Sequence, residues 1–171
     1  MLVLGLDPGL AITGYGFVEG DSRNLKAVAY GVLRTPPHTP LADRLLQLHK
    51  ELSQLLVCYH PDVVALEELF FSTNVRTAIT VGEARGVLLF AAAEAGLKVA
   101  EYTPLQVKQA ITGYGQADKA QVQQMVRLLL SLAEIPHPDD AADALAVSIC
   151  HHHSARMAEL VEGKRGQASD R

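Results

Sequence analysis

The stretch LVLGLDPG at residues 2–9 decides the fold expected for this chain. Residues 2–6 are continuously apolar, as in a buried strand, and the run ends at Asp7 in the turn-forming sequence DPG. Two further strand patterns follow closely, at 13–18 and 27–33. Connections this short favour antiparallel neighbours, so we expect three antiparallel strands, the first of which ends in an acid.

Downstream of these strands the sequence alternates between helix and strand patterns. Strands are expected at 63–66 and 97–102, with a long helix rich in alanine and glycine at 75–95 between them. An amphipathic helix precedes them, and we expect Thr39 to be its N-cap and Pro40 its first residue. Its apolar positions recur at helical spacing: Leu41, Leu45, Leu48, Leu52 and Leu55.

Three more helix starts complete the pattern. The pair TP at 103–104 is a cap followed by proline, and Asp118 with Gln121 forms a capping box. Asp139 or Asp140 opens the last helix. Three antiparallel strands followed by alternating helices and strands predict an α/β fold with a mixed five-stranded sheet flanked by helices.

Length and composition indicate a single globular unit. The chain has 171 residues, of which 49% are hydrophobic, which suffices for a sizeable core. We expect this domain to occupy residues 1–157, and the polar residues 158–171 to form a disordered tail. No apolar run approaches the ~20 residues of a membrane helix, and no secretory leader is evident, so a cytoplasmic protein without a membrane partner is expected.

The two cysteines, Cys58 and Cys150, lie in mostly apolar helical surroundings and do not form a C-x-x-C pair. We expect both to be buried, reduced thiols. A disulfide or a zinc site is the less favoured alternative.

Acids stand at the ends of several predicted elements. In VVALEELFF, at residues 63–71, Glu67 and Glu68 end a buried strand. In PDDAADALA, at residues 138–146, Asp140 and Asp143 are three residues apart and therefore project from one face of a helix. Together with Asp7, these segments would bring hard oxygen ligands together from three parts of the chain.

Each acid also has an ordinary structural explanation. Asp140 and Asp143 could cap a helix start, Asp7 could serve an Asx-turn, and Glu67 or Glu68 could be a solvated strand end. Their combination instead indicates a Mg²⁺-dependent phosphodiesterase that cuts nucleic acid. Such a centre holds two ions ~3.5 to 4 Å apart, and Asp7, the most central acid, is the expected bridge between them.

The net charge of −4 is unusual for a protein that binds DNA. Two Mg²⁺ ions in the acidic site would raise it by 4, to 0, and leave the cations free to gather on one face. The local distribution of charge therefore matters more than the total.

Aromatic and basic residues near these acids are candidate DNA contacts. Phe70 and Phe71 directly follow the acidic strand, and Phe70 is our choice to stack at a branch point, although either ring could instead cover the core. Lys108 and Lys119 flank the loop TGYGQ, at residues 112–116, and are the favoured phosphate contacts.

Other polar residues are weaker candidates. Arg76 and Arg85 lie on the long predicted helix near the aromatic loop, where a solvated surface role is the alternative. The run His151, His152 and His153 resembles a metal tract, but consecutive helical residues point in different directions and Mg²⁺ prefers oxygen. We assign these histidines no catalytic role.

Five segments together resemble the RuvC family of bacterial Holliday-junction resolvases, in the order and spacing of that family. The resemblance runs from about residue 2 to residue 153. The segments are GLDPGLAITGYG, VVALEELFFSTN, GEARG, PLQVKQAITGYGQADKAQVQQMV and DDAADALAVSICHHH.

The resemblance implies an RNase H-like homodimer that nicks a four-way DNA junction symmetrically. It implies two Mg²⁺ ions per subunit, which Mn²⁺ could replace, and RuvA and RuvB as partners. The residues that match the family's catalytic acids are Asp7, Glu67, Asp140 and Asp143, those that match its DNA-contacting lysines are Lys108 and Lys119, and Phe70 matches its junction-inserting aromatic residue.

Two positions depart from the family pattern. Glu68 stands where relatives often carry glutamine, and Asp139 extends the final acidic pair to a triplet. Which acid of the pairs Glu67/Glu68 and Asp139/Asp140 contacts metal therefore stays open. For the dimer interface, we expect the long helix at 75–95.

Two other functions share parts of these patterns. A non-catalytic junction-binding or RNA-processing relative could have the same fold, because fold does not fix activity. Actin-like ATPases also place an aspartate in a glycine-rich strand turn, but they need two such domains and 171 residues are too few.

Overall fold

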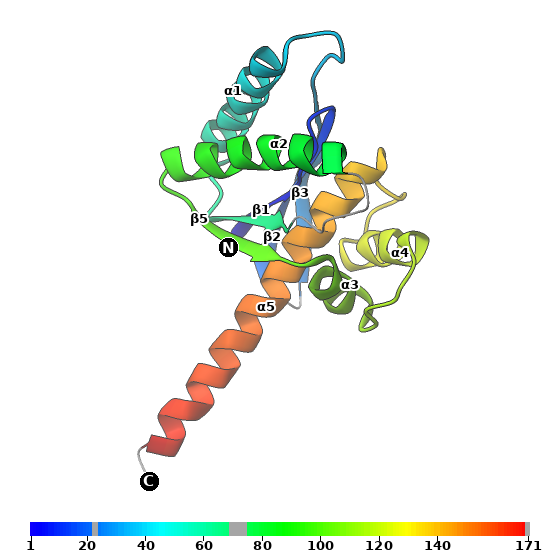
Figure 1. Cartoon of the computed structure of the whole chain (residues 1–171). Coiled ribbons are helices and arrows are strands. Elements are labelled where there is room, and N and C mark those ends of the chain that lie inside the picture. Colours follow the sequence, from blue (N-terminus) through cyan, green and yellow to red (C-terminus); the bar gives the residue numbers. More distant parts are fainter. Residues whose placement is uncertain (22–23, 69–74, 170–171) are drawn as a thin grey trace.

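The computed structural model describes the backbone of residues 1–21, 24–68 and 75–169; side chains are described for these residues except 75–76 and 156–169. The chain forms one five-stranded sheet with the strand order β3-β2-β1-β4-β5 (Figure 1). The strands are β1 (Leu2–Asp7), β2 (Ile12–Asp21), β3 (Asn24–Arg34), β4 (Val63–Glu67) and β5 (Lys98–Tyr102). The helices are α1 (Leu41–Tyr59), α2 (Val75–Glu94), α3 (Pro104–Thr112), α4 (Lys119–Leu129) and α5 (Asp139–Ser169).

The pairing of the strands confirms the predicted mixed sheet. β1 and β2 pair antiparallel, as do β2 and β3, whereas β4 runs parallel to both β1 and β5. Each predicted strand lies within an observed one or differs from it by a single residue at its start. β1 is therefore the central strand, and Asp7 is its last residue.

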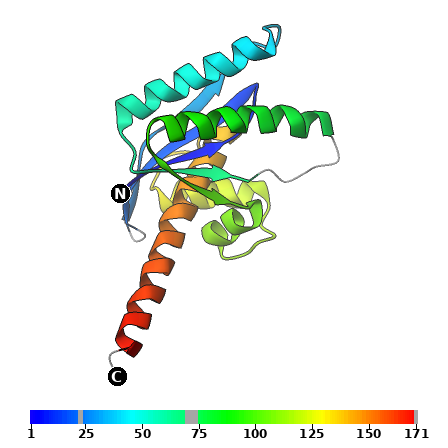
Figure 2. The ribbon, with the colours of Figure 1, turned by 60° about the vertical axis from the view of Figure 1, so that its left-hand side comes forward.

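Helices cover both faces of the sheet (Figure 2). α1 and α2 pack over one face, and α5 crosses the other with α3 and α4 beside it. Apolar side chains of β1 and β4 alternate between the two cores: Leu4, Leu6, Val64 and Leu66 lie under α1 and α2, while Val3, Val63 and Ala65 lie under α5. Because alternation has period two, Asp7 and Glu67 belong to the α5 face.

Glycines allow α5 to lie directly on this face. A Cβ atom added to Gly5 would overlap the backbone of Ala144, and one added to Gly14 would overlap the backbone of Asp140. Gly14 is also the cross-strand partner of Asp7. The missing side chain therefore brings the first turn of α5 against the end of β1.

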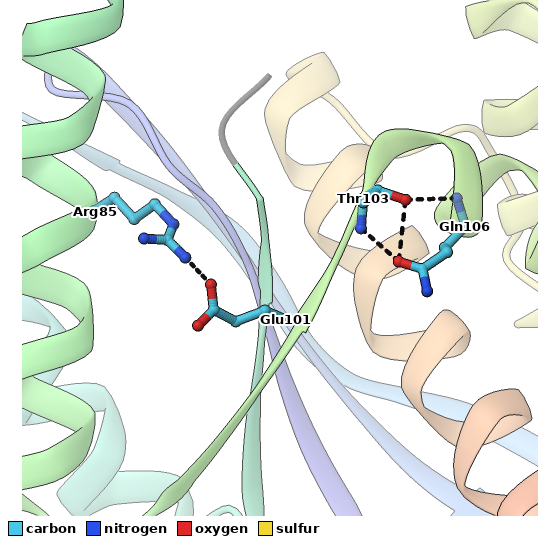
Figure 3. Close-up of polar contacts among 4 residues, drawn as sticks. All are labelled: Arg85, Glu101, Thr103 and Gln106. Carbon is cyan, nitrogen blue, oxygen red and sulfur yellow. Dashed lines mark hydrogen bonds and ion pairs between the residues drawn. The ribbon is translucent and has the colours of Figure 1, made fainter. Parts of the chain in front are cut away.

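Two of the predicted caps are confirmed. The Gln106 backbone N–H donates to Thr103 Oγ1 at 3.2 Å, and the Thr103 N–H donates to Gln106 Oε1 at 2.8 Å (Figure 3). Asp118 and Gln121 form the same reciprocal pair, at 2.8 and 2.9 Å. These caps fix the starts of α3 and α4, the helices that carry Lys108 and Lys119.

Two local predictions were wrong. Pro40, with φ −52° and ψ 145°, occupies the N-cap position of α1, so the helix begins at Leu41 and Thr39 does not cap it. Its extended ψ keeps Pro40 outside the helix. Both cysteines are free as expected, but Cys58 is exposed, because it lies two residues after buried Leu56 and so on the outer side of α1.

The end of the chain and its relation to membranes add two observations. α5 continues to Ser169, but the side chains of residues 156–171 are not described, so the expected division between a domain at 1–157 and a tail at 158–171 stays a prediction. Across the described part of the chain, no helix combines the length and the apolar composition needed to cross a membrane.

Candidate active site at the ends of the central strands

Asp7 and Glu67 end neighbouring parallel strands. The residues before them, Leu6 and Leu66, are register partners, so the two carboxylates leave the same edge of the sheet on the α5 face. Asp140 and Asp143 belong to the first turns of α5, which lie against β1 and β2. The structure thus brings the acids from all three sequence segments to one place.

Crowding of negative charge is strongest at Asp7. Burial raises the pKa of Asp7 to about 8, and repulsion from Glu67, Asp143 and Asp140 contributes to the increase. Burial also raises the pKa of Glu67 to about 7, with Asp143 adding to the shift. A carboxyl group with so high a pKa is poorly solvated and surrounded by like charge, which are the conditions of a functional site.

Lys119 supplies positive charge to this cluster. Its Nζ lies 3.0 Å from Asp143 Oδ2 and 3.2 Å from Asp139 Oδ2. Burial raises the pKa of Asp143, and the ion pair with Lys119 opposes that increase. Lys119 is therefore paired with Asp143, a carboxylate that we predicted to bind metal.

A pocket of about 250 Å³ opens beside the acids. Two acids, Glu67 and Asp143, and two cations, Lys108 and Lys119, line it. The remaining wall is largely apolar and is formed by Pro104, Val107, Val122 and Ala146. Carboxylates next to ammonium groups suit a phosphodiester, because the ammonium groups attract the phosphate while the acids can bind cations.

The acidic side chains have the chemistry to bind a divalent cation, but they are not close enough together to do so in this arrangement. Within the described residues, no three histidine, cysteine, aspartate or glutamate side chains are close enough to hold a metal ion as they stand. The four acids nevertheless share one charged neighbourhood, and carboxylate oxygens are the ligands that Mg²⁺ prefers. The donor set fits such an ion, provided that Lys119 releases Asp143 and the carboxylates draw together.

The other predicted DNA contacts are only partly accounted for. Lys108 lines the pocket as expected. Phe70 and Phe71 lie outside the described residues, and Arg76 is in α2 but its side chain is not described. Glu68 is exposed, and its backbone N–H donates to the carbonyl of Tyr102 at 2.8 Å.

Arg85 has a structural partner away from the pocket. Its guanidinium pairs with Glu101, which links α2 to β5 (Figure 3). The side chain of Arg85 is 19% exposed, so this cation is largely withdrawn from solvent. Arg85 therefore has neither the solvated surface role given as the alternative nor a free guanidinium for a phosphate, because it pairs with Glu101.

The three consecutive histidines bind three different elements. His151 Nδ1 lies 2.8 Å from Tyr102 Oη, His152 Nε2 lies 3.0 Å from the Val18 carbonyl, and His153 Nδ1 lies 3.0 Å from the Ala110 carbonyl. They tie α5 to β5, β2 and α3. Their divergence agrees with the expectation that they form no metal tract.

Sequence reasoning missed two contributors to the site. Gly14 lets α5 approach Asp7, and the only signal for this was the spacing of small residues in the GYG of β2. Asp139 was considered as a helix start and as an extra acid, whereas the structure pairs it with Lys119. That pair joins two helix starts and has no local sequence signature.

Known proteins resemble this chain over nearly all of its length. The family model described as crossover junction endodeoxyribonuclease RuvC matches residues 3–151. Crossover junction endodeoxyribonuclease RuvC of Desulfitobacterium hafniense is 58% identical over 163 residues, covering 95% of this chain and 99% of the relative. The protein of that name from Heliobacterium modesticaldum is 60% identical over 154 residues, covering 90% of this chain and 95% of the relative.

Solved structures show the same similarity. T. thermophilus RuvC in complex with Holliday junction substrate matches with a TM-score of 0.89 and 40% sequence identity, over 92% of this chain and 96% of that one. This match confirms the RNase H-like fold expected from the sequence.

Proposed function

Because this chain belongs to the RuvC family of crossover junction endodeoxyribonucleases, we propose that it resolves four-way DNA junctions by paired, symmetric nicks in recombination and repair. The observation that carries the proposal is the gathering of Glu67, Asp140 and Asp143 around partly buried Asp7, beside a pocket lined by two lysines. The solved complex of T. thermophilus RuvC with Holliday junction substrate supports the choice of DNA.

The reaction we propose depends on divalent cations held by Asp7, Glu67, Asp140 and Asp143. We expect two Mg²⁺ ions per subunit, with Mn²⁺ able to replace them. When bound, such ions would activate the attacking water and stabilise the leaving 3′ oxygen. The raised pKa values of Asp7, about 8, and Glu67, about 7, support this, because cations would offset the repulsion that ionised acids meet there.

The protein's own groups would position the DNA. Lys108 and Lys119 enter the pocket from α3 and α4, where their ammonium groups can bind the phosphates next to the scissile bond. The apolar wall of the pocket would limit access of bulk water. For Phe70, Phe71 and Arg76 the resemblance to the family is the support, with Phe70 proposed to insert at the junction centre.

A homodimer would match the substrate. A four-way junction is two-fold symmetric, so two identical sites related by a two-fold axis can cut strands of like polarity. α2 is the proposed interface, because it exposes Ile79 and Phe90 at 58% and 60%. A domain at residues 1–157, cooperation with RuvA and RuvB and a cytoplasmic location are proposed from the sequence and from the family.

The alternative, a non-catalytic or RNA-processing relative, is less favoured because all four acids are present and share one site. The test is to incubate the protein with a synthetic four-way junction, a matched duplex and the corresponding RNA, with and without Mg²⁺, and to map the nicks. We expect paired nicks in the DNA junction alone, and only with Mg²⁺. Equal cutting of duplex and junction, or cutting of RNA alone, would refute the proposal.

A further inference from the structure

Lys119 lies between two carboxylates with different surroundings. Its Nζ is 3.0 Å from Asp143 Oδ2 and 3.2 Å from Asp139 Oδ2. The two acids are four residues apart on α5, so they lie on one side of the helix. Lys119 reaches them from the first turn of α4, whose start is fixed by Asp118.

The acids in the first turns of α5 divide into an inner and an outer set. The charges of Asp140 and Asp143 raise the pKa of Asp7, the centre of the acidic site. The charge of Asp139 instead raises the pKa values of Asp143 and Lys119. The side chain of Asp139 is 53% exposed, compared with 31% for that of Asp143. Asp139 therefore lies at the rim of the site and Asp143 within it.

Lys119 and a divalent cation would compete for Asp143. Positive charges that share one carboxylate repel each other, so a divalent cation bound to Asp143 would displace the ammonium group. A displaced lysine without another partner would either return to Asp143 or leave for solvent. Asp139 gives it a second partner 3.2 Å away, on the outer side.

We propose that Asp139 is a positioning residue that holds Lys119 at the rim of the acidic site, so that Asp143 can exchange the lysine for a divalent cation while Lys119 stays ready for a DNA phosphate. The inference rests on the proposed function, because it requires that Asp143 binds metal. Asp139 contacts neither the cation nor the scissile bond and acts through Lys119.

If the pair of Lys119 and Asp139 were purely structural, replacing Asp139 would lower the stability of the fold and leave cation affinity unchanged. Both partners are more than half exposed, and exposed ion pairs contribute little to fold stability. Replacing Asp139 should therefore lower the melting temperature only slightly, through the loss of one acid from the first turn of α5, and should mainly alter cation binding. Melting temperature and cation affinity thus separate the two roles.

The experiment is a double-mutant cycle without DNA, in which Mn²⁺ binding is measured by electron paramagnetic resonance at about 0.15 M KCl to screen distant charges. The proteins are the wild type, Asp139→Asn, Lys119→Met and the double variant. Asp139→Asn should weaken Mn²⁺ binding at least about threefold, because Lys119 then has only Asp143 as a partner. Lys119→Met should bind Mn²⁺ more tightly, and in its background Asp139→Asn should change affinity less than about 1.5-fold.

Two controls accompany the cycle. Asp139→Glu should keep most of the wild-type affinity, because it keeps a carboxylate for Lys119. Asp43→Asn makes the same change of charge at an exposed position of α1, on the opposite face of the sheet, and should have no effect. If Asp139→Asn fails to fold, Asp139→Ser takes its place in the cycle.

An equal effect of Asp139→Asn in both backgrounds would overturn the inference, because Asp139 would then act only through its own charge. No effect in either background would overturn it as well. Junction cleavage by the wild type is scored separately. If the wild type cuts junctions but the effect of Asp139→Asn on Mn²⁺ affinity does not depend on Lys119, only the role of Asp139 is refuted. If that dependence is found but no junction is cut, only the proposed function is refuted. A wild type that binds no Mn²⁺ would also overturn the inference, and the cleavage assay alone would then decide the proposed function.

Discussion

Gly14 of β2 lies directly against the backbone carbonyl of Asp140 in the first turn of α5. The same glycine pairs with Asp7 across the β1–β2 ladder. One position without a side chain thus sets the approach of two candidate catalytic segments to each other. The relationship explains how a helix more than 130 residues away in sequence reaches the end of the first strand.

Replacing Gly14 tests this relationship. A methyl group in Gly14→Ala would overlap the Asp140 backbone and push α5 away from β1. We expect a loss of about 1–3 kcal/mol in the free energy of unfolding, together with reduced junction cleavage. Gly86→Ala is the matched control, because an added Cβ there meets nothing within 4 Å and alanine favours a helix. Similar losses in both variants, measured by denaturant unfolding, would contradict the account.

Asp7→Asn should separate catalysis from folding. We expect junction binding to persist while cleavage falls at least ~10²-fold, about 2.7 kcal/mol of barrier. The pKa of Asp7 is raised from 3.8 to about 8 in the folded state, so its stabilising contribution is complete below 3.8 and is lost as the pH rises to about 8. Metal-free Asp7→Asn should therefore be more stable than the wild type, by a margin that is larger at pH 8 than at pH 5. Full cleavage activity, or a margin that does not grow with pH, would refute the assignment.

Cation binding should depend on pH in a defined window. With pKa values of about 8 and about 7, Asp7 and Glu67 keep protons near neutrality that a cation must displace. Mg²⁺ affinity should therefore rise between about pH 6 and pH 8, with proton release that calorimetry in buffers of different ionisation enthalpy can count. Binding without proton release at pH 6.5 would indicate that neither acid is a ligand.

Two histidines of α5, the half-buried His151 and the buried His152, should make the fold sensitive to acid. Burial lowers the pKa of His151 and His152 below the usual 6.5, so the unfolded chain takes up protons first and stability is lost as the pH falls through 6.5. His152→Gln should lose stability at pH 7, since it disturbs the bond to the Val18 carbonyl, yet show a flatter decline between pH 7 and pH 5. Exposed His38→Gln should behave like the wild type in chemical unfolding at each pH. A slope unchanged by His152→Gln would contradict this explanation.

Local patterns predicted most of the fold. Apolar runs ending in DPG and in paired glutamates marked the ends of β1 and β4, and alternation of side chains accounts for why Asp7 and Glu67 share a face. The cap at Thr103 was predicted from Thr103 and Pro104, and the capping box at Asp118 from Asp118 and Gln121. These signals are local, because they depend on neighbours along the chain.

Sequence patterns did not predict the contacts between elements that are distant along the chain. The pairing of Lys119 with Asp139 and Asp143 depends on how α4 packs beside α5, and each histidine of the run depends on what surrounds α5. The exposure of Cys58 was also missed, because an apolar neighbourhood in sequence does not show which side of α1 faces the core. Such features are set by packing and require coordinates.

We propose that acids from three distant segments close around shared divalent cations. The most direct test is a crystal of the wild-type protein soaked in Mn²⁺, with the ions located by anomalous diffraction. We expect Mn²⁺ bound by Asp7, with a pair of ions ~3.5 to 4 Å apart when junction DNA is present, and Lys119 moved away from Asp143. Ions bound elsewhere, or an Asp7 carboxylate that contacts none of them, would contradict the account.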